Sequence, residues 1–165
     1  MGLAATVIAL GVRLFLLPAS DTVVAADAVV VLPDSGQAGL QEGLGLVNAQ
    51  VSSTLVVLGG AERIGGAERL CTGHDAVEVL CPAVAAQTRE QARALAALVA
   101  ERGWTAVVLV AARTEISRDT LQVSRCTEVT LLRRAVSTHD ALGTPFAALA
   151  AVPSYLRALV LQEGC

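Results

Sequence analysis

Short runs of consecutive aliphatic residues recur along this chain, separated by longer stretches with helical spacing of apolar positions. Each run is rich in Val and Leu and is bounded by Gly, Pro, Asp or Thr, a pattern typical of a strand buried on both faces. The predicted strands are Ala28–Leu32, Thr54–Leu58, Ala76–Leu80, Ala106–Val110 and Glu128–Leu132. Because long crossovers separate them, these strands predict one α/β domain with a five-stranded, mainly parallel sheet and right-handed connections.

The stretches outside the strands predict four helices: Gly39–Gln50, Thr88–Arg102, Glu115–Cys126 and Pro145–Leu161. The second has the clearest boundaries. Thr88 is placed to cap its start, Gln91 follows three residues later to reciprocate, and Gly103 ends it. The first is weaker, because Gly43 and Gly45 each cost about 1 kcal/mol relative to Ala.

The first segment of the chain is almost wholly apolar. Leu3–Leu17 contains only Thr6 and Arg13 as polar residues and ends at Pro18. A bilayer is spanned by about 20 apolar residues, and a central Arg costs about 2.5 to 3.5 kcal/mol, so this is a marginal span. We expect residues 1–20 to form an anchor or signal-anchor in the cytoplasmic membrane and residues 21–165 to form one extracytoplasmic domain. The alternative is the buried first helix of a soluble protein.

Composition narrows the choice of partners. The chain has 165 residues, a net charge of -3 and an isoelectric point near 5.3. Nucleic acid is therefore excluded as the principal partner, because phosphate backbones are bound by concentrated Lys and Arg. The sequence contains no Lys, which also excludes Schiff-base chemistry and Lys-dependent phosphate sites.

Four cysteines form an even set: Cys71, Cys81, Cys126 and Cys165. In an exported chain they favour two disulfides, and we prefer Cys71 with Cys81 and Cys126 with Cys165 among the three pairings. A zinc site built from Cys71, His74 and Cys81 is one alternative, although it lacks a fourth ligand and the usual paired spacing. Four reduced thiols in a cytosolic protein are the other.

Candidate ligand-binding residues follow the predicted strands. In an open parallel sheet, ligands bind beyond the carboxyl ends of the strands. Gly59 and Gly60 there could admit an anion to backbone N–H groups, although a simple turn also explains them. Thr88 and Glu90 begin a helix at the same edge, where Thr88 could hold an anion or act as a cap.

Two arginines follow the fourth strand and could bind phosphate or carboxylate: Arg113 and Arg118. Glu115 lies between them and is expected to pair with one of them on the helix surface. No metal site, dinucleotide motif or P-loop motif is indicated, so no cofactor is expected. Ser137, His139 and Asp140 are neighbours in a polar loop, which is not the geometry of a catalytic triad.

Several segments, in the same order along the chain, resemble the YdcF-like family, which includes the SanA and ElyC envelope proteins. The match covers most of Asp27 to Leu132. It rests on Asp27–Leu32 as the opening strand, Leu55–Gly60 as the second strand with its Gly-Gly turn, Thr88–Ala92 as the Thr-x-Glu-Asn-Ala segment, and Val107–Arg118 as the strand before Thr-Ser-x-x-His-x-x-Arg.

The resemblance implies a three-layer Rossmann-like fold and, for exported members, a membrane-anchored role in envelope or peptidoglycan homeostasis. Carried over residue by residue, it implicates Gly59, Gly60, Thr88, Glu90 and Arg118. The chain departs from the family at three places. Pro33–Gly36 replaces the Gly-rich turn, Ala111–Ala112 replaces Thr-Ser, and Glu115 replaces His. Any role of that His in relatives is therefore lost or altered here.

Three functional hypotheses follow, and whether the protein is an enzyme stays open. The first is an anchored envelope protein whose cleft binds a small anionic, phosphate-containing ligand through Gly59, Thr88 and Arg118. The second is a degenerate binding or scaffold protein without turnover, suggested by Ala111, Ala112 and Glu115. The third is a soluble cytoplasmic binder of a nucleotide or S-adenosylmethionine, which requires free cysteines.

Overall fold

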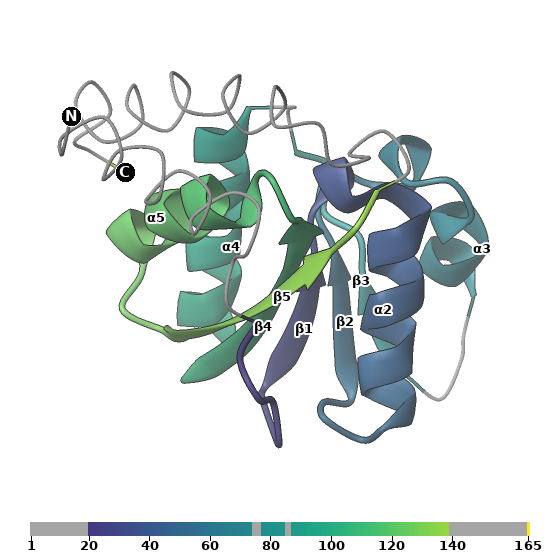
Figure 1. Cartoon of the computed structure of the whole chain (residues 1–165), viewed down its shortest axis with the longest axis horizontal. Helices are drawn as coiled ribbons and strands as arrows, with labels where there is room; N and C mark the ends of the chain where they lie inside the picture. The colour runs from purple at the N-terminus through teal and green to yellow at the C-terminus, as the bar shows by residue number, and fades with distance from the viewer. Residues whose placement is uncertain (1–19, 74–76, 85–86, 139–164) are drawn as a thin grey trace, which may run out of the picture.

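A computed structural model describes residues 20–73, 77–84, 87–138 and 165. Its five strands form one parallel sheet in the order β3-β2-β1-β4-β5 (Figure 1). The strands are β1 (Ala28–Val31), β2 (Thr54–Val57), β3 (Glu78–Leu80), β4 (Ala106–Ala112) and β5 (Thr130–Val136). The helices are α2 (Gly36–Asn48), α3 (Ala67–Thr72), α4 (Thr88–Arg102) and α5 (Ile116–Cys126), with short 3-10 turns η2 (Pro33–Ser35) and η3 (Ala61–Arg63).

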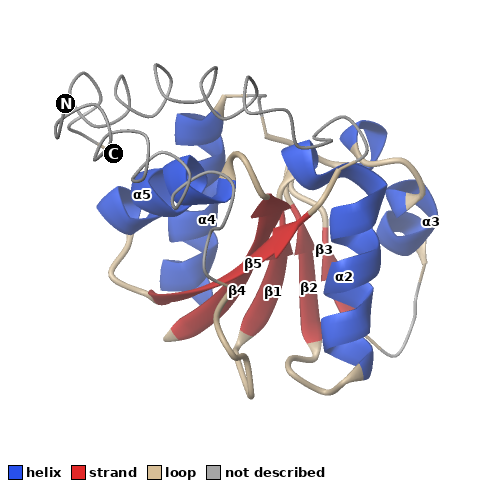
Figure 2. Cartoon of the chain, in the orientation of Figure 1, coloured by secondary structure: helices blue, strands red, loops and turns tan. Residues whose placement is uncertain are grey.

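Helices cover both faces of the sheet, which makes three layers (Figure 2). Successive side chains of a strand point to opposite faces, so each central strand feeds two cores. Val30 and Leu109 pack with α4 and α5, while Val29 and Val108 pack with α2 and α3. The predicted three-layer Rossmann-like α/β fold is thus confirmed.

The prediction that all five strands are buried on both faces is right for the centre and wrong for the edges. Every residue of β1 and β2 is buried, but β3 begins with the exposed Glu78 and most of β5 is half-buried. Edge strands have a neighbour on one side only. β5 also runs on past its predicted end at Leu132, because Arg133 and Arg134 occupy strand positions that an aliphatic pattern does not reveal.

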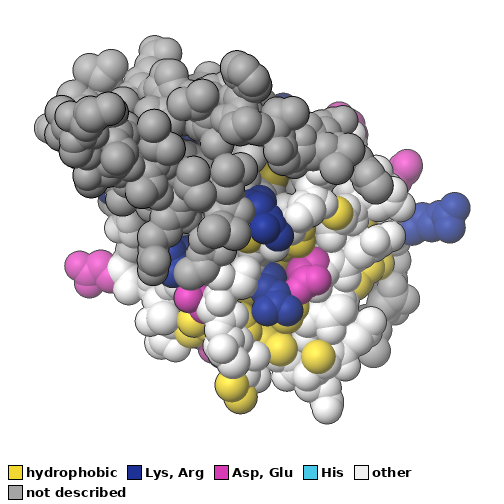
Figure 3. Space-filling model, viewed as in Figure 1, with side chains coloured by type: hydrophobic (Ala, Val, Ile, Leu, Met, Phe, Trp, Pro, Cys, Tyr) yellow, Lys and Arg dark blue, Asp and Glu magenta, His cyan; other side chains and the backbone are white. Residues whose placement is uncertain are grey.

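Ion pairs fix these two arginines. Arg133 contacts Asp21, whose Oδ2 accepts the Arg133 backbone N–H at 2.7 Å while its own N–H donates to the Arg133 carbonyl at 3.0 Å. The guanidinium of Arg134 contacts Glu42 of α2 at 2.6 Å. On the face shown in Figure 3, side chains of opposite charge accordingly lie beside one another.

One helix approaches the sheet more closely than its sequence suggested. A Cβ at Gly43 of α2 would lie 2.7 Å from Val31 Cγ2 and 3.2 Å from Leu55 Cδ1. Gly43 therefore lets α2 lie directly on β1 and β2. Gly45, on the exposed side of the same helix, has no neighbour within 4 Å.

The boundaries of α4 agree with the prediction, but Thr88 is not its cap. The N-cap residue is Gln87, in an extended conformation and without a side-chain cap hydrogen bond, and Thr88 is the first helical residue. The Gln91 N–H donates to the Gln87 carbonyl. Because the chain enters the helix one residue early, the predicted reciprocal cap of Thr88 and Gln91 does not form.

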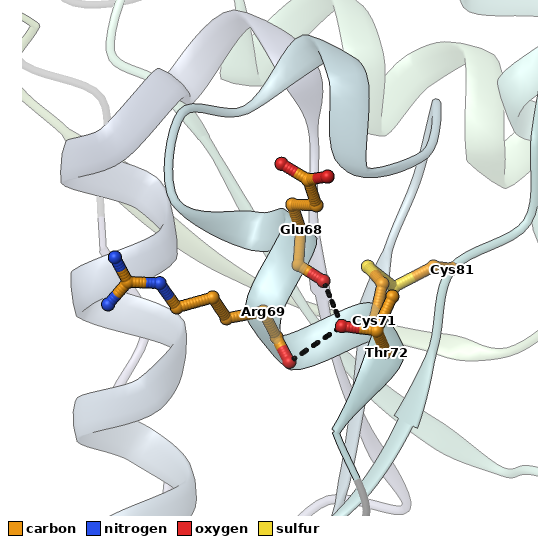
Figure 4. The surroundings of a disulfide bond; sticks show 5 residues. All are labelled: Glu68, Arg69, Cys71, Thr72 and Cys81. Atoms are coloured by element: carbon orange, nitrogen blue, oxygen red, sulfur yellow. Dashed lines mark hydrogen bonds between the residues drawn. A yellow bond between two sulfur atoms is a disulfide. The ribbon is translucent and has the colours of Figure 1, made fainter.

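Both predicted disulfides are confirmed. Cys71 of α3 is bonded to Cys81, which follows β3, with their Cα atoms 5.8 Å apart (Figure 4). Cys126 at the end of α5 is bonded to Cys165, with their Cα atoms 4.8 Å apart. The alternatives of a zinc site and of four free thiols are therefore wrong. Disulfides are typical of oxidising compartments outside the cytoplasm.

Some predicted features lie outside the described residues. These are the apolar segment before Ser20, the helix over 145–161, and the residues His74, His139 and Asp140. Among the helices that the structure describes, none has the length and apolar character needed to span a bilayer.

Candidate functional site

The strand order reverses between β1 and β4, which are neighbours in the sheet although distant in the chain. The loop after β1 leads to α2 on one face, and the loop after β4 leads to α5 on the other. A crevice opens where two such loops part at the carboxyl edge of a parallel sheet. This switch point is where ligands bind in folds of this class.

Four charged residues gather at the switch point: Asp34, Glu115, Arg118 and Asp119. We call them the switch-point cluster. Arg118 Nη1 contacts Glu115 Oε2 at 2.7 Å, and its Nη2 and Nε contact Asp119 Oδ1 at 3.1 and 3.2 Å. From the other loop, Asp34 Oδ2 accepts the Ala112 backbone N–H at 2.9 Å. The two loops of the switch point are thereby linked.

Asp119 is a buried carboxylate. It is 2% exposed and lies on the inner face of α5, in line with the buried Ile116 and Val123. Residues three and four positions apart share one face of a helix, so helical geometry forces Asp119 inward. Its contact with Arg118 offsets only part of the cost of placing a charge there.

The pKa of Asp119 is raised to about 8, first by burial and then by the negative charge of Asp34, against the opposing effect of Arg118. The pKa of Asp34 is also raised, first because surrounding protein displaces water, and in addition by Glu115. The Ala112 N–H and Arg118 oppose that shift. Asp34 is the more exposed residue, and Asp119, which is 2% exposed, is the more perturbed of the two.

Arg118 remains charged in this setting. Burial alone would lower its pKa, but Asp119 and Glu115 outweigh that effect, and the pKa is raised overall. A guanidinium has five N–H donors. Three of its nitrogen contacts go to the two carboxylates, and its side chain is still 26% exposed. The N–H groups outside these contacts and the exposed part of the side chain are available to bind an anion.

The structure brings together two of the predicted site residues directly. Glu115 and Arg118 form an ion pair, as expected for neighbours three positions apart on a helix. Glu115 is also the N-cap residue of α5, without a side-chain cap hydrogen bond. Arg113, at the start of this loop, donates its backbone N–H to the Val136 carbonyl of β5.

Gly59 and Gly60 follow β2 and adopt φ values of +86° and +77°. Only Gly takes up such values readily, so the turn requires them. A Cβ at Gly59 would lie 2.9 Å from Pro33 Cγ. The Gly-Gly turn is therefore packed against the loop after β1, next to the switch point.

Thr88 and Glu90 occupy the first turn of α4 and are half-buried. α4 and α5 lie on the same face of the sheet, and both run from its carboxyl edge. Their N-terminal turns therefore share the edge that carries the switch-point cluster.

Two members of the cluster were missed by sequence reasoning. Asp34 occupies the turn after β1 where the resembling family has glycines, and its importance comes from a contact with Ala112, distant in the chain. Asp119 carried a usable signal, because an acidic residue in line with Ile116 and Val123 interrupts an apolar stripe.

Outside the switch-point cluster, a metal site and a surface hollow are the other possibilities to consider in the described part of the chain. No three His, Cys, Asp or Glu side chains among the described residues are arranged to hold a metal ion. An open hollow of about 350 Å³ lies at the opposite, amino edge of the sheet. It is lined by Val47, Gln50, Ser52, Ser53 and Val77, none of which is charged.

Comparison with known proteins leaves the family open: no family model, no curated protein and no solved structure matches the chain. The YdcF-like resemblance stays a prediction.

Proposed function

We propose that this protein binds a small phosphate-containing anion at the switch-point cluster, as a YdcF-like protein of the cell envelope held at the outer side of the cytoplasmic membrane. Three independent features support the proposal: the placement of Arg118, the turn at Gly59 and Gly60, and the two disulfides.

The observation that carries the proposal is the setting of Arg118. The side chain stands at the reversal of strand order, in the first turn of α5, where backbone N–H groups of a helix start point toward the edge. Two carboxylates hold its guanidinium in one orientation, which reduces the entropy lost when a ligand binds. A planar guanidinium matches the oxygen pairs of a phosphate group.

The proposed location rests on the disulfides and on the N-terminal sequence, not on the switch-point cluster. Two disulfides are consistent with an oxidising compartment, and the apolar segment before Ser20 would supply the membrane attachment. The third hypothesis, a cytoplasmic nucleotide or S-adenosylmethionine binder, needed free cysteines and is not pursued.

One observation favours a second candidate, a binding or scaffold protein that performs no reaction. Arg118 is already satisfied by Glu115 and Asp119, so a ligand has to compete with two internal carboxylates. Ala111 and Ala112 also provide no hydroxyl at the end of β4. In this case the cluster stabilises the loops and binds no anion.

A thermal-shift experiment separates the two candidates. Sulfate, a phosphodiester and a diphosphate ester are titrated into the full chain, into Arg118→Ala and into Arg102→Ala. Arg102 is the control, because it forms an ion pair with Glu78 at the other edge of the sheet and its side chain is 35% exposed. We expect the anions to raise the melting temperature of wild type and of Arg102→Ala. The apparent affinity obtained from these shifts should be at least about tenfold weaker for Arg118→Ala. Equal shifts in all three proteins would remove Arg118 from the site, and no shift with any anion would favour the scaffold.

A further inference from the structure

The carboxylates around Arg118 have a consequence for how an anion can bind. Arg118 is the positive member of the cluster, and it faces Glu115 and Asp119 directly. The cluster holds three carboxyl groups and one guanidinium. An arriving anion therefore adds a further negative charge to a group of side chains that already contains more acids than bases. The cluster has to lose negative charge elsewhere for the ligand to stay.

Asp119 is the member least able to remain ionised. Its side chain is 3% exposed, whereas the side chain of Glu115 is 27% exposed and can be hydrated. A buried ion that loses its partner is an uncompensated charge in a poorly polar environment, and such groups become neutral instead. Sharing Arg118 with an anion has this effect on Asp119.

We propose that binding of an anion at Arg118 is coupled to the uptake of one proton by the carboxyl pair of Asp34 and Asp119. The inference rests on the proposed function and concerns how the same site is regulated. The proton goes to whichever carboxylate of the pair is ionised, and no covalent bond to the ligand is made. A phosphodiester monoanion that enters with one proton leaves the charge of the cluster unchanged, and for the sulfate dianion one proton offsets one of its two charges.

The charges around Asp119 agree with this coupling. Those that act on it most strongly are Asp34 from η2 and Arg118 and Glu115 from α5. Glu90 of α4 and Arg113 of the loop after β4 lie at the same edge. The pKa of Asp119, raised to about 8 by burial and by Asp34, lies in the range where an added negative charge completes its protonation.

The sign of the pH dependence follows. A bound anion raises the pKa of the pair further, so the complex holds more protons than the free protein near neutral and mildly alkaline pH. Affinity for an anion of constant charge should then fall as pH rises, by up to about tenfold per pH unit between the pKa of the free and of the bound state.

Calorimetric titration of the full chain with sulfate tests the proposal, because the charge of sulfate is constant across this range. Heats are measured at about pH 8 in two buffers of different ionisation enthalpy, which yields the number of protons taken up. Because Asp119, with a pKa of about 8, is already about half protonated at pH 8, we expect it to take up as much as about half a proton per sulfate bound to wild type, and Asp34 adds to this number to the extent that it is ionised. A phosphodiester is titrated in the same way.

Two variants sharpen the result. Asp119→Asn keeps the shape and a hydrogen bond to Arg118 but cannot be protonated. Sulfate should therefore bind to this variant with less proton uptake than to wild type and with a weaker dependence of affinity on pH, because Asp34 alone can still take up a proton. Glu115→Gln also removes a competing carboxylate from Arg118, yet it should retain the proton uptake. A thermal melt of each variant at about pH 6 confirms that it is folded.

The possible failures are distinct. Binding without a difference between the two buffers in wild type overturns the proton coupling and leaves the proposed anion site standing. The same conclusion follows if Asp119→Asn and Glu115→Gln change the proton count equally. Absence of binding by sulfate and by the phosphodiester at every pH overturns the proposed function and the coupling together.

Discussion

At the scale of single residues, Asp119 shows how one position can serve the fold poorly and a site well. A hydrophobic residue in line with Ile116 and Val123 would pack into the core under α5 without the cost of burying a charge. The carboxylate instead holds the guanidinium of Arg118 at the edge of the sheet. Perturbed carboxylates in crevices are frequent at functional sites, which agrees with the proposed role of this edge.

The stability of the protein should depend on pH through Asp119. Its pKa rises from an ordinary value of 3.8 in the unfolded chain to about 8 in the folded protein. Stability from this group is therefore complete below about pH 4 and is lost as pH rises toward about 8. Asp34 acts in the same direction. Asp21, Asp27 and Glu78 have lowered pKa values and act below this window.

We expect Asp119→Asn to be about as stable as wild type near pH 5 and more stable by on the order of a few kcal/mol near pH 8, because Asn carries no charge to bury. Urea unfolding of both proteins across this range is the measurement. If the two stability curves run parallel, Asp119 is not the perturbed group.

At the scale of elements, the two glycines of α2 have opposite roles. From the sequence alone, Gly43 and Gly45 are equivalent, because each lowers the helix propensity of its segment. In the structure Gly43 is buried against Val31 and Leu55, whereas Gly45 is exposed with open space around it. Only the contact between α2 and the sheet distinguishes them.

Alanine substitutions should therefore change stability in opposite directions. Gly45→Ala is expected to raise the free energy of unfolding by about 0.5 to 1 kcal/mol, because Ala favours the helix. Gly43→Ala gains the same propensity but forces α2 away from β1, and we expect a net loss on the order of 1 kcal/mol or more. Denaturant unfolding of the two variants measures these changes. Equal changes in the free energy of unfolding would show that α2 does not lie closely on the sheet.

At the scale of the whole molecule, the sequence was sufficient for the architecture. Aliphatic runs such as Ala28–Val31 and Ala106–Ala112 form strands because burial on both faces selects Val, Leu and Ala, and the parallel order follows from the crossovers. The exposed edge strands and the length of β5 were not evident, because they depend on neighbours. Partners such as Asp21 for Arg133 lie far away in the chain.

The site was also predictable only in part, because some of its contacts join residues that are distant in the chain. Parallel strands bring Gly59, Thr88 and Arg118 to one edge, and helical spacing brings Glu115 to Arg118. The contact of Asp34 with Ala112 joins two loops through the reversal of strand order, which periodicity does not specify. Both cysteine pairs, in contrast, agree with the pairing preferred from the sequence among the three possible ones.

The disulfides allow a check on the compartment. Freshly extracted protein, denatured without reductant, should show no titratable thiol, because all four cysteines are paired. Reduction should then release four thiols and lower stability by about 3 to 4 kcal/mol for each loop opened. Four thiols before reduction would contradict the extracytoplasmic location.

The proposed binding of an anion where β1 and β4 meet can be tested by NMR, with backbone amide chemical shifts recorded during a titration with sulfate. We expect the largest chemical-shift changes at Gly59, Ala112 and the first turn of α5, with changes at the Arg118 guanidinium. Residues of the opposite hollow, such as Gln50 and Ser53, should not move. Chemical-shift changes confined to that hollow, or spread evenly over the protein, would contradict an anion site at the switch point.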